Sequence, residues 1–353
     1  MAAPRQEVVT LLLPPTLRQC LVAAGFRTTA DLHGIGPVDL SAELSISPDE
    51  ALLILKVANI HNDAGLCGAR SAQHLYEKEL AARKIITFCG DLDGMLGGGV
   101  ATGQITEFCG VPAVGKTQLG IQLAIDVQIP AAFGGLGASA VYIDTEGSFM
   151  VERVVEIANA CIRHLKKLAN NDGSATRKEA ASKVSRDGML ANIHFFRVRD
   201  CTEQLAVTQM LPSFIANHPE VKLIVIDSIA FHFRQDFQDM AQRTRVLAEM
   251  AQKLMHLAEE KDLAVVLMNQ VTTKVLDNNR GSKLVPALGD SWAHAATSRV
   301  ILYWQEQTRH AFLYKTTPDI FHMWRANNGT SDKRVAAGCI DIKNNVCIIL
   351  HPS

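Results

Sequence analysis

The sequence has no hydrophobic run approaching the roughly 20 residues that a membrane-spanning helix needs. It also shows no secretory pattern at its start, where Glu7 precedes a short apolar run that Pro14 and Pro15 interrupt. The formal net charge is −1, so no overall positive field attracts nucleic acid. These absences argue against membrane insertion and against a strongly basic, solitary DNA-binding protein. Any DNA contact is expected from local loops or from partner chains.

The cysteines show neither a Cys-x-x-Cys pair nor a histidine at zinc-binding spacing, although the chain has eight of them. A disulfide framework and a structural zinc site are therefore not expected, and reduced thiols in a nuclear or cytosolic protein fit better. The chain has 353 residues, of which 48% are hydrophobic. This length and composition predict one large domain with a substantial core, together with a smaller domain.

Residues 1–62 are predicted to form a small helical domain of the helix-hairpin-helix type. Apolar residues recur at helical spacing between glycine-rich turns, and Ser47 followed by Pro48 is a typical helix start. Such a bundle could bind the DNA backbone through helix N-termini or could dock a protein, and both interpretations stay open. Residues 63–83 are interpreted as a linker that ends in a short helix.

Residues 84–353 are predicted to form an α/β domain with a mostly parallel sheet, because continuous apolar runs alternate with helical segments. The runs are Ile105–Cys109, Ala140–Ile143, Leu223–Ile226, Leu263–Met268 and Val300–Tyr303. The polar stretch at residues 170–187 is predicted to be a mobile surface insertion. Residues 338–350 are predicted to close the domain as a hairpin around Asn344 and Asn345.

A phosphate-binding loop is the most specific motif in the chain. The motif consists of Gly110, Val111, Pro112, Ala113, Val114, Gly115, Lys116 and Thr117. It matches Gly-x-x-x-x-Gly-Lys-[Ser/Thr] fully, after a predicted strand and before a helix that begins at Gln118. A chance match has odds of about one per cent at average glycine usage. Backbone N–H groups are expected to surround the phosphates of ATP, with Lys116 on the β- and γ-phosphates and Thr117 on Mg²⁺.

Polar residues end three of the predicted strands, where function gathers in a doubly wound sheet. Asp227 follows four apolar residues and is predicted to organise Mg²⁺. Glu146 is the candidate that orients water towards the γ-phosphorus, with Asp144 as its rival. Gln270 is placed to contact the γ-phosphate and to move the loop that follows it. An acid at the end of a buried strand can also be an ordinary turn former.

Together these motifs resemble the RecA-family recombinases, and the resemblance covers about residues 14–315. The segments that carry it are Leu92–Gly99, Gly103–Glu107, Gly110–Gln118, Asp144–Gly147, Leu223–Ser228, Asn269–Thr272 and Gly289–Ala295. The resemblance implies a RecA-like ATPase core that uses ATP and Mg²⁺, with Lys116, Glu146 and Gln270 as catalytic residues. It also places Gln118 in the nucleotide site and Arg153 near the adenine. Further matches, such as Val285–Trp292, are similar to the eukaryotic recombinase paralogues, in particular the subgroup designated C.

Two segments are implied to face DNA, residues 231–243 and residues 272–288. Their candidate DNA-binding residues are Arg234, Arg243, Lys274, Arg280 and Lys283. The first segment lacks the glycine-flanked arginine of a filament-forming recombinase, and the linker lacks the Phe-x-x-Ala through which such proteins self-assemble. In its place the linker offers Leu66–Ala69 or Ala72–Leu75. These departures favour a hetero-complex over a homopolymer.

The resemblance therefore implies a weak, Mg²⁺-dependent and DNA-stimulated ATPase subunit in a complex with other recombinase paralogues. The complex would act on single-stranded or branched DNA in the nucleus, and also in the cytoplasm, and would use a nucleotide site shared with a neighbour. The basic tail that can act as a nuclear signal in this subgroup is absent from the sequence. Three alternatives remain: ATP as structural glue at an interface, a self-sufficient strand-exchange recombinase, and a hexameric RecA-fold motor or phosphotransferase.

Overall fold

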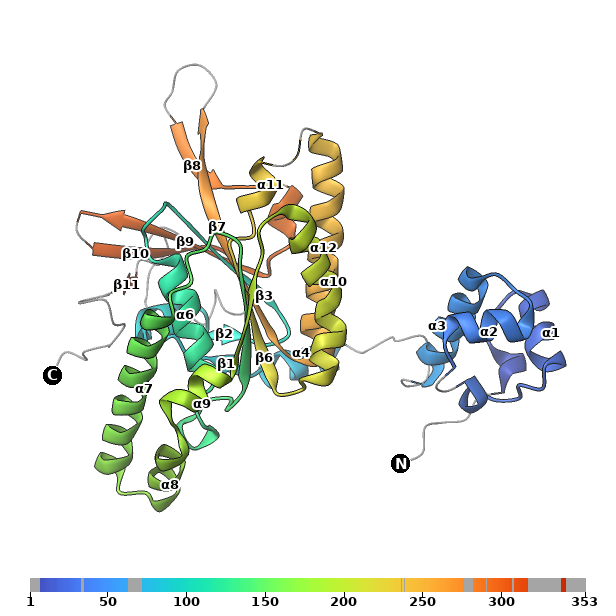
Figure 1. Ribbon diagram of the computed structural model, residues 1–353, viewed down its shortest axis with the longest axis horizontal. Coiled ribbons are helices and arrows are strands. Elements are labelled where there is room, and N and C mark those ends of the chain that lie inside the picture. The colour runs from blue at the N-terminus through green and yellow to red at the C-terminus, as the bar shows by residue number, and fades with distance from the viewer. Residues whose placement is uncertain are drawn as a thin grey trace. The chain divides into compact units, whose positions relative to one another are not determined.

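The computed structural model describes residues 7–32, 35–62, 72–235, 237, 239–275, 282–289, 291–306, 308–316 and 338–340 (Figure 1). Internal contacts divide the chain into two units, Met1–Ala81 and Ala82–Ser353. The division falls two residues before Lys84, where the sequence predicts the start of the core domain. None of the helices among the described residues combines the length and the apolar character of a membrane span.

The N-terminal unit consists of short helices. Its elements are η1 Val8–Thr10, α1 Pro15–Ala23, η2 Thr29–Leu32, α2 Pro37–Leu44, α3 Pro48–Asn62 and α4 Ala72–Leu80. Leu21, Leu40 and Ile54 are fully buried in its core. Ser47 caps α3 reciprocally: its hydroxyl accepts from the backbone N–H of Glu50, and the Glu50 carboxylate accepts from the backbone N–H of Ser47. The predicted helix start at Ser47 is therefore confirmed.

The second unit is an α/β domain. Its helices are α5 Gly90–Met95, α6 Lys116–Asp126, η3 Ala131–Phe133, α7 Val151–Asp172, α8 Ala175–Lys183, α9 Arg186–Ala191, α10 Cys201–Asn217, α11 Phe231–Gln235, α12 Met240–Lys261 and η4 Ser291–His294. Its strands are β1 Lys84–Ile85, β2 Val100–Ala101, β3 Ile105–Gly110, β4 Ser139–Asp144, β5 Ile193–Arg197, β6 Val221–Asp227, β7 Ala264–Val275, β8 Ser282–Pro286, β9 Ser298–Gln305, β10 Thr308–Lys315 and β11 Gly338–Ile340.

The main sheet runs in the order β11-β10-β9-β3-β7-β6-β4-β5, and β8 pairs with β7. Strands β9, β3, β7, β6, β4 and β5 pair in parallel, whereas β10, β11 and β8 add antiparallel pairs. Helices cover both faces, with α6 and α7 on one and α10 and α12 on the other (Figure 1). Along β6, Val225 packs with the first layer and Ile224 with the second. The predicted mostly parallel sheet is confirmed, and strands buried on both faces explain the continuous apolar runs.

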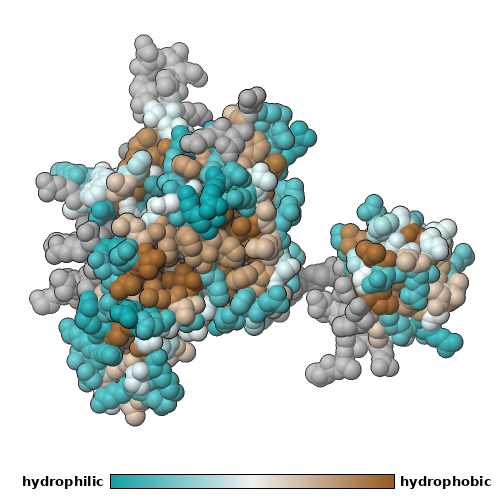
Figure 2. Space-filling model, in the orientation of Figure 1, coloured by the Kyte–Doolittle hydropathy of each residue, from teal (hydrophilic) through white to brown (hydrophobic). Residues whose placement is uncertain are grey.

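Residues 170–187 differ from the prediction of a mobile insertion, because they are helical. Helix α7 extends to Asp172, and two further helices begin after Ser174 and Ser185. Each of these serine hydroxyls accepts from a backbone N–H in the first turn of its helix, which the polar composition alone did not reveal. The surface here is hydrophilic over the outer parts of α7 and α8, as composition indicated (Figure 2).

Both segments predicted to be DNA-facing loops contain regular structure. The first is largely helical, in α11 and the start of α12. The second is a hairpin, because β7 continues past Gln270 and pairs with β8 from Val271↔Pro286 to Val275↔Ser282. β-branched residues that favour extended pairing account for this continuation. Of the predicted C-terminal hairpin, Gly338–Ile340 pairs with β10 and the remainder lies outside the described residues.

Candidate nucleotide site

The carboxyl ends of four parallel strands meet at one edge of the sheet and bring distant motifs together. The register places Gly110 of β3 opposite Gln270 of β7. It likewise places Asp144 of β4 opposite Asp227 of β6. Because β6 lies between β7 and β4, the phosphate-loop strand and all three polar strand ends share this edge. The geometry matches the sheet edge where α/β proteins bind ligands.

The phosphate loop leaves β3 at Gly110 and enters α6 at Lys116. Gly115 has φ 107° and Ala113 has φ 61°, so two residues adopt left-handed backbone within this short turn. A Cβ added at Gly110 would lie 2.7 Å from the Val114 Cγ1 and 2.8 Å from the Leu302 carbonyl oxygen. The glycines are therefore required by the close fold of the loop. This fold places the N-terminus of an eleven-residue helix beside the loop, where an anion is stabilised.

Lys116 points back into the loop. Its Nζ donates to the carbonyl oxygens of Gly110 and Val111, each at 2.9 Å. Burial lowers the pKa of this ammonium group, while the negative charges of Asp227 and Glu146 act in the opposite direction. The cation is thus partly desolvated between neutral carbonyl partners. A phosphate offers it a stronger, charge-assisted partner.

Thr117 and Asp227 supply a pair of oxygen donors suited to a hard divalent cation. The Asp227 carboxylate is buried; it accepts from the Tyr142 hydroxyl at 2.9 Å and also from the side chain of Thr117. Burial raises the pKa of Asp227 to about 6, against the lowering effect of these hydrogen bonds. The Thr117 hydroxyl also lies 3.4 Å from the Ser148 hydroxyl. Hydroxyl and carboxylate oxygens are the ligand types that Mg²⁺ prefers, so these residues fit that ion.

The structure separates the two rival acids at the end of β4. The Asp144 carboxylate accepts four backbone N–H groups: Oδ1 from Glu146, Gly147 and Ser148 at 3.1, 2.8 and 3.2 Å, and Oδ2 from Phe149 at 3.3 Å. Asp144 therefore organises the turn after β4. That turn presents the exposed side chain of Glu146 at the sheet edge. The geometry favours Glu146 as the acid that is available to a water molecule.

A chain of side-chain hydrogen bonds links Glu146 to the neighbouring strands. Its Oε1 accepts from the Ser228 hydroxyl at 2.6 Å and from the Gln270 Nε2 at 2.9 Å. The Gln270 Oε1 in turn accepts from the guanidinium of Arg234 on α11. Ser228 and the contact of Arg234 with Gln270 were missed by the sequence motifs. The position of Ser228 directly after Asp227 was the available signal for the first.

Arg153 lies on the first turn of α7 and contacts the helix that follows the phosphate loop. Its Nε donates to the Gln118 Oε1 at 2.7 Å, and its Nη1 forms an ion pair with Glu156. The structure thus brings Arg153 and Gln118 together beside the loop, where the resemblance implied an adenine contact.

A buried polar cluster centred on Glu107 supports this sheet edge and was not predicted. Glu107 lies in the middle of β3 and is fully buried, with 0% exposure. Its Oε1 accepts from the Asn269 Nδ2 at 2.7 Å and from the Trp292 indole N–H at 2.9 Å, while its Oε2 pairs with Arg299. Asn269 directly precedes Gln270. An acid within the apolar run Ile105–Cys109 was the sequence signal for this cluster.

The candidate DNA-binding residues are distributed over three elements. Arg234 lies on α11, Arg243 lies on the first turn of α12, and Lys274 is opposite Lys283 in the register of the β7–β8 hairpin. Arg280 lies outside the described residues, as does the linker motif at residues 66–69.

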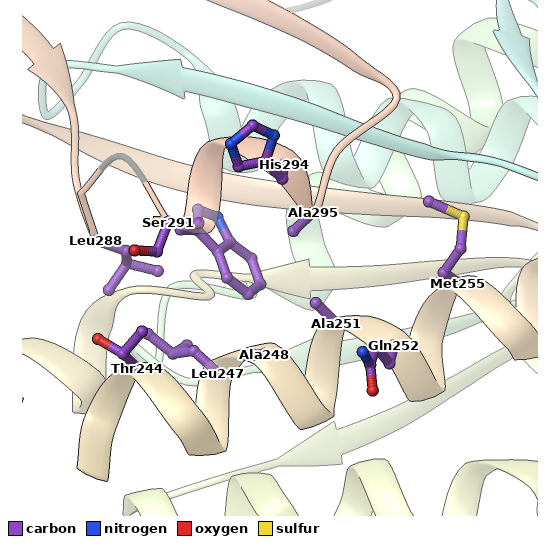
Figure 3. Close-up of a pocket in the computed structure, with 11 residues that line it drawn as sticks. Thr244, Leu247, Ala248, Ala251, Gln252, Met255, Leu288, Ser291, His294 and Ala295 are labelled. Carbon is purple, nitrogen blue, oxygen red and sulfur yellow. The ribbon is translucent and has the colours of Figure 1, made fainter. Parts of the chain in front are cut away.

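A separate pocket of about 280 Å³ lies between α12 and the η4 segment (Figure 3). Leu247 and Ala251 line it from α12, and Trp292 and Ala295 from the opposite wall. Of the described residues that line it, none belongs to the phosphate loop, so it is distinct from the nucleotide site. Trp292 lines this pocket and also belongs to the buried cluster, because its indole N–H donates to Glu107.

Two histidines and one acid form a further polar group at the amino ends of β5 and β6, whereas the candidate nucleotide site lies at the carboxyl ends of the strands. The possible ligand atoms of His194, His218 and Glu220 lie within 4.8 Å of one another. The His218 Nδ1 is 3.1 Å from the Glu220 Oε1, and both rings pack against Phe214. An aromatic cluster with a surface His–Glu hydrogen bond accounts for this arrangement.

Comparisons with known proteins identify the family of the chain. A family model described as Rad51 matches residues 80–320. The chain is 47% identical over 321 residues to the DNA repair protein RAD51 homolog 3 of Cricetulus griseus, which covers 88% of this chain and 87% of that protein. It is 40% identical over 272 residues to the protein of the same name from Dictyostelium discoideum, covering 77% of this chain and 70% of that protein. The similarity to the recombinase paralogues that the sequence motifs indicated is confirmed.

Proposed function

The chain belongs to the Rad51 family, and on that premise we propose that it is an ATP-binding, DNA-dependent ATPase subunit of a recombinase-paralogue complex. Its role is to assist homologous recombination during the repair of double-strand breaks and stalled forks. The relatives' name, DNA repair protein RAD51 homolog 3, supports this role. The observation that carries the proposal is the meeting of Lys116 and Asp227 with the hydrogen-bonded pair Glu146–Gln270 at one sheet edge.

Nucleotide binding is assigned to the phosphate loop and the start of α6. Backbone N–H groups of residues 113–118 would surround the phosphates, and Lys116 would exchange its carbonyl partners for phosphate oxygens. Thr117 and Asp227 would hold Mg²⁺, which would supply positive charge to offset the negative charge of the phosphates. Arg153, positioned against Gln118, lies near the adenine.

Hydrolysis is assigned to Glu146 and Gln270. Water attacks the γ-phosphorus, the bond between that phosphorus and the bridging oxygen of ADP breaks, and Glu146 orients the water and receives its proton. Gln270 contacts the γ-phosphate through its amide, at the start of the β7–β8 hairpin. Gln270 thereby links the bound nucleotide to the β7–β8 hairpin, which carries Lys274 and Lys283.

DNA and partner chains complete the proposed assembly. Arg234, Arg243 and the hairpin lysines are assigned to the phosphates of single-stranded or branched DNA. Other recombinase paralogues are the proposed partners, and one of them covers the nucleotide and supplies a further cation, so that turnover by the isolated chain is weak. Function in recombination places the complex in the nucleus, with a pool in the cytoplasm.

One alternative is that ATP serves as structural glue between subunits and that its turnover is not required. The Ser228 and Gln270 side chains that hold Glu146 in this structure are compatible with a resting site. The two functions differ in what Glu146 contributes. A subunit that hydrolyses ATP needs the Glu146 carboxylate for turnover. A subunit in which ATP only stabilises the interface needs the phosphate loop alone.

The test compares Lys116→Ala with Glu146→Gln in the full chain. Lys116→Ala is expected to weaken ATP binding by about 100-fold, since a charge-assisted contact to phosphate is lost. Glu146→Gln should bind ATP normally and lose Mg²⁺-dependent turnover with single-stranded DNA. Unchanged ATP affinity in the first variant would contradict the nucleotide site. Normal turnover and normal support of recombination by the second would favour structural glue.

Mass photometry with and without ATP and Mg²⁺ addresses assembly. A monomer with weak, DNA-responsive ATPase is expected, because the proposed site is completed by a different paralogue. Long ATP-dependent filaments with rapid turnover would instead identify a self-sufficient recombinase. A closed ring that unwinds duplex DNA by itself would identify a helicase.

A further inference from the structure

Arg234 occupies an unusual position between the surface and the hydrolytic residues. It is exposed on α11, yet its guanidinium donates to the Gln270 amide oxygen, and the Gln270 Nε2 donates to Glu146. An arginine side chain has donors and no acceptor, so it selects the oxygen of the amide and turns the NH₂ group towards Glu146. The exposed arginine therefore sets the orientation of Gln270.

The backbone on both sides of this contact is held in place. Phe233, next to Arg234, is buried and stacks on Phe237 with ring centroids 5.5 Å apart. The Gln270 backbone N–H donates to the Asn269 side-chain oxygen at 2.7 Å, and its carbonyl accepts from the Ala287 N–H at 2.8 Å. Both residues thus have anchored backbones. A change of partner can occur by side-chain rotation alone.

We propose that Arg234 is the residue through which DNA controls ATP hydrolysis: without DNA it holds Gln270 on Glu146, and a DNA phosphate releases both. The proposal rests on the proposed ATPase function. The present partner of Arg234 is a neutral amide oxygen, whereas a phosphate is an anion that can accept two hydrogen bonds from the guanidinium fork. Both partners accept from the same cation, but the phosphate adds a negative charge and can accept two parallel hydrogen bonds, so it displaces the amide.

Release of Gln270 has two consequences at the site. Its amide becomes free to rotate towards the γ-phosphate, and the Glu146 Oε1 loses one of the two donors that occupy it. The carboxylate can then accept a water molecule in place of the amide. Arg234 acts through Gln270 and is a positioning residue. The coupling is reciprocal, because ATP that draws Gln270 towards its γ-phosphate also frees Arg234 for DNA.

The experiment measures ATPase rates of the full chain with and without saturating single-stranded DNA, for wild type, Arg234→Ala, Arg234→Lys and Arg245→Ala. In Arg234→Ala, the rate without DNA should rise severalfold towards the DNA-saturated wild-type rate. The ratio of rates with and without DNA should fall to about one. Arg234→Lys keeps a cationic donor and should restore most of the DNA response. Arg245 is an exposed arginine on α12 without an assigned role, and its replacement should leave the ratio unchanged.

A second readout separates coupling from simple loss of DNA affinity. Arg234→Ala should reduce the slope of log affinity against log salt by about 0.7, the value for one phosphate contact on a single strand. Its ATP affinity should be at least that of wild type, because ATP no longer has to draw Gln270 away from Arg234.

Three outcomes would overturn the coupling. The first is that Arg234→Ala keeps the wild-type ratio of ATPase rates with and without DNA. The second is that Arg234→Ala hydrolyses ATP slowly both without DNA and at saturating DNA. The third is a wild type that hydrolyses ATP at the same rate with and without DNA, which would leave ATP hydrolysis standing but not its dependence on DNA. A wild type without any Mg²⁺-dependent turnover would refute the ATPase itself, and the coupling with it.

Discussion

Replacement of Glu107 by glutamine tests the buried cluster beneath the nucleotide site, because it removes one charge and keeps the side-chain shape. Glu107 is 0% exposed and its partner Arg299 is 2% exposed, so neither charge is screened by water. The Arg299 Nη2 already lacks a hydrogen-bond partner among the described residues. Glu107→Gln would leave the guanidinium buried without a counter-charge, at a cost of about 3–5 kcal/mol in the free energy of unfolding.

A double-mutant cycle isolates the interaction between the two charges. Arg299→Met alone strands the Glu107 carboxylate and should also cost about 3–5 kcal/mol. In the double variant Glu107→Gln/Arg299→Met, the amide oxygen still accepts from Asn269 and Trp292, and no buried charge remains. Its loss should be only about 1–2 kcal/mol, which gives a coupling energy of at least about 4 kcal/mol.

The assay is urea unfolding followed by the fluorescence of the tryptophans and by circular dichroism. Trp292 and Trp304 lie in the second unit, whereas circular dichroism reports on the helices of both units. A transition seen in both signals is therefore assigned to the second unit. Additive losses in the double variant, or a loss below about 1 kcal/mol for Glu107→Gln, would refute the reasoning. Such a result would mean that water reaches the pair and screens its charges.

Two further predictions concern Asp227, the proposed Mg²⁺ ligand, and the β7–β8 hairpin. Burial raises the pKa of Asp227 from 3.8 in the unfolded chain to about 6 in the folded protein. The folded state therefore binds the proton more tightly than the unfolded state. With a chelator present to remove metal ions, the free energy of unfolding should fall as pH rises from about 4 through about 6. Asp227→Asn should remove this loss of about 3 kcal/mol at most, seen as a thermal midpoint above wild type near pH 7.5 that converges with it near pH 4. The exposed substitution Asp91→Asn is the control, and a constant difference across this pH range would contradict the prediction. The register places Lys274 opposite Lys283, so replacing both with alanine should weaken single-stranded DNA binding and lower its salt slope by about 1.4. An unchanged slope would remove the hairpin from the DNA interface.

Sequence patterns were sufficient to predict the elements that depend on residues close together in the chain. The phosphate loop is one run of eight residues, and its glycines and lysine predict the same turn wherever a strand and a helix flank it. Asp227 and Gln270 could be assigned to one edge because apolar runs between helices imply a parallel sheet, whose carboxyl ends coincide. The helical course of residues 170–187 was missed because capping by Ser174 and Ser185 was outweighed by polar composition.

Contacts between side chains far apart in the chain were beyond any local pattern. Which acid after β4 faces the site depended on Asp144 accepting four backbone N–H groups, and this required the coordinates of the turn. The pairing of Glu107 with Arg299 depends on β3 lying between β7 and β9 in the strand order. The contact of Arg234 with Gln270 likewise depends on β6 and β7 being neighbours.

The sequence by itself determined the phosphate-loop motif of this protein, because its glycines, Lys116 and Thr117 lie within a few residues of one another along the chain. Only the tertiary structure decided how that motif is connected to its surroundings. Strand order and register place residues up to 192 positions apart within hydrogen-bonding distance, and that order is a property of the whole sheet and not of any segment.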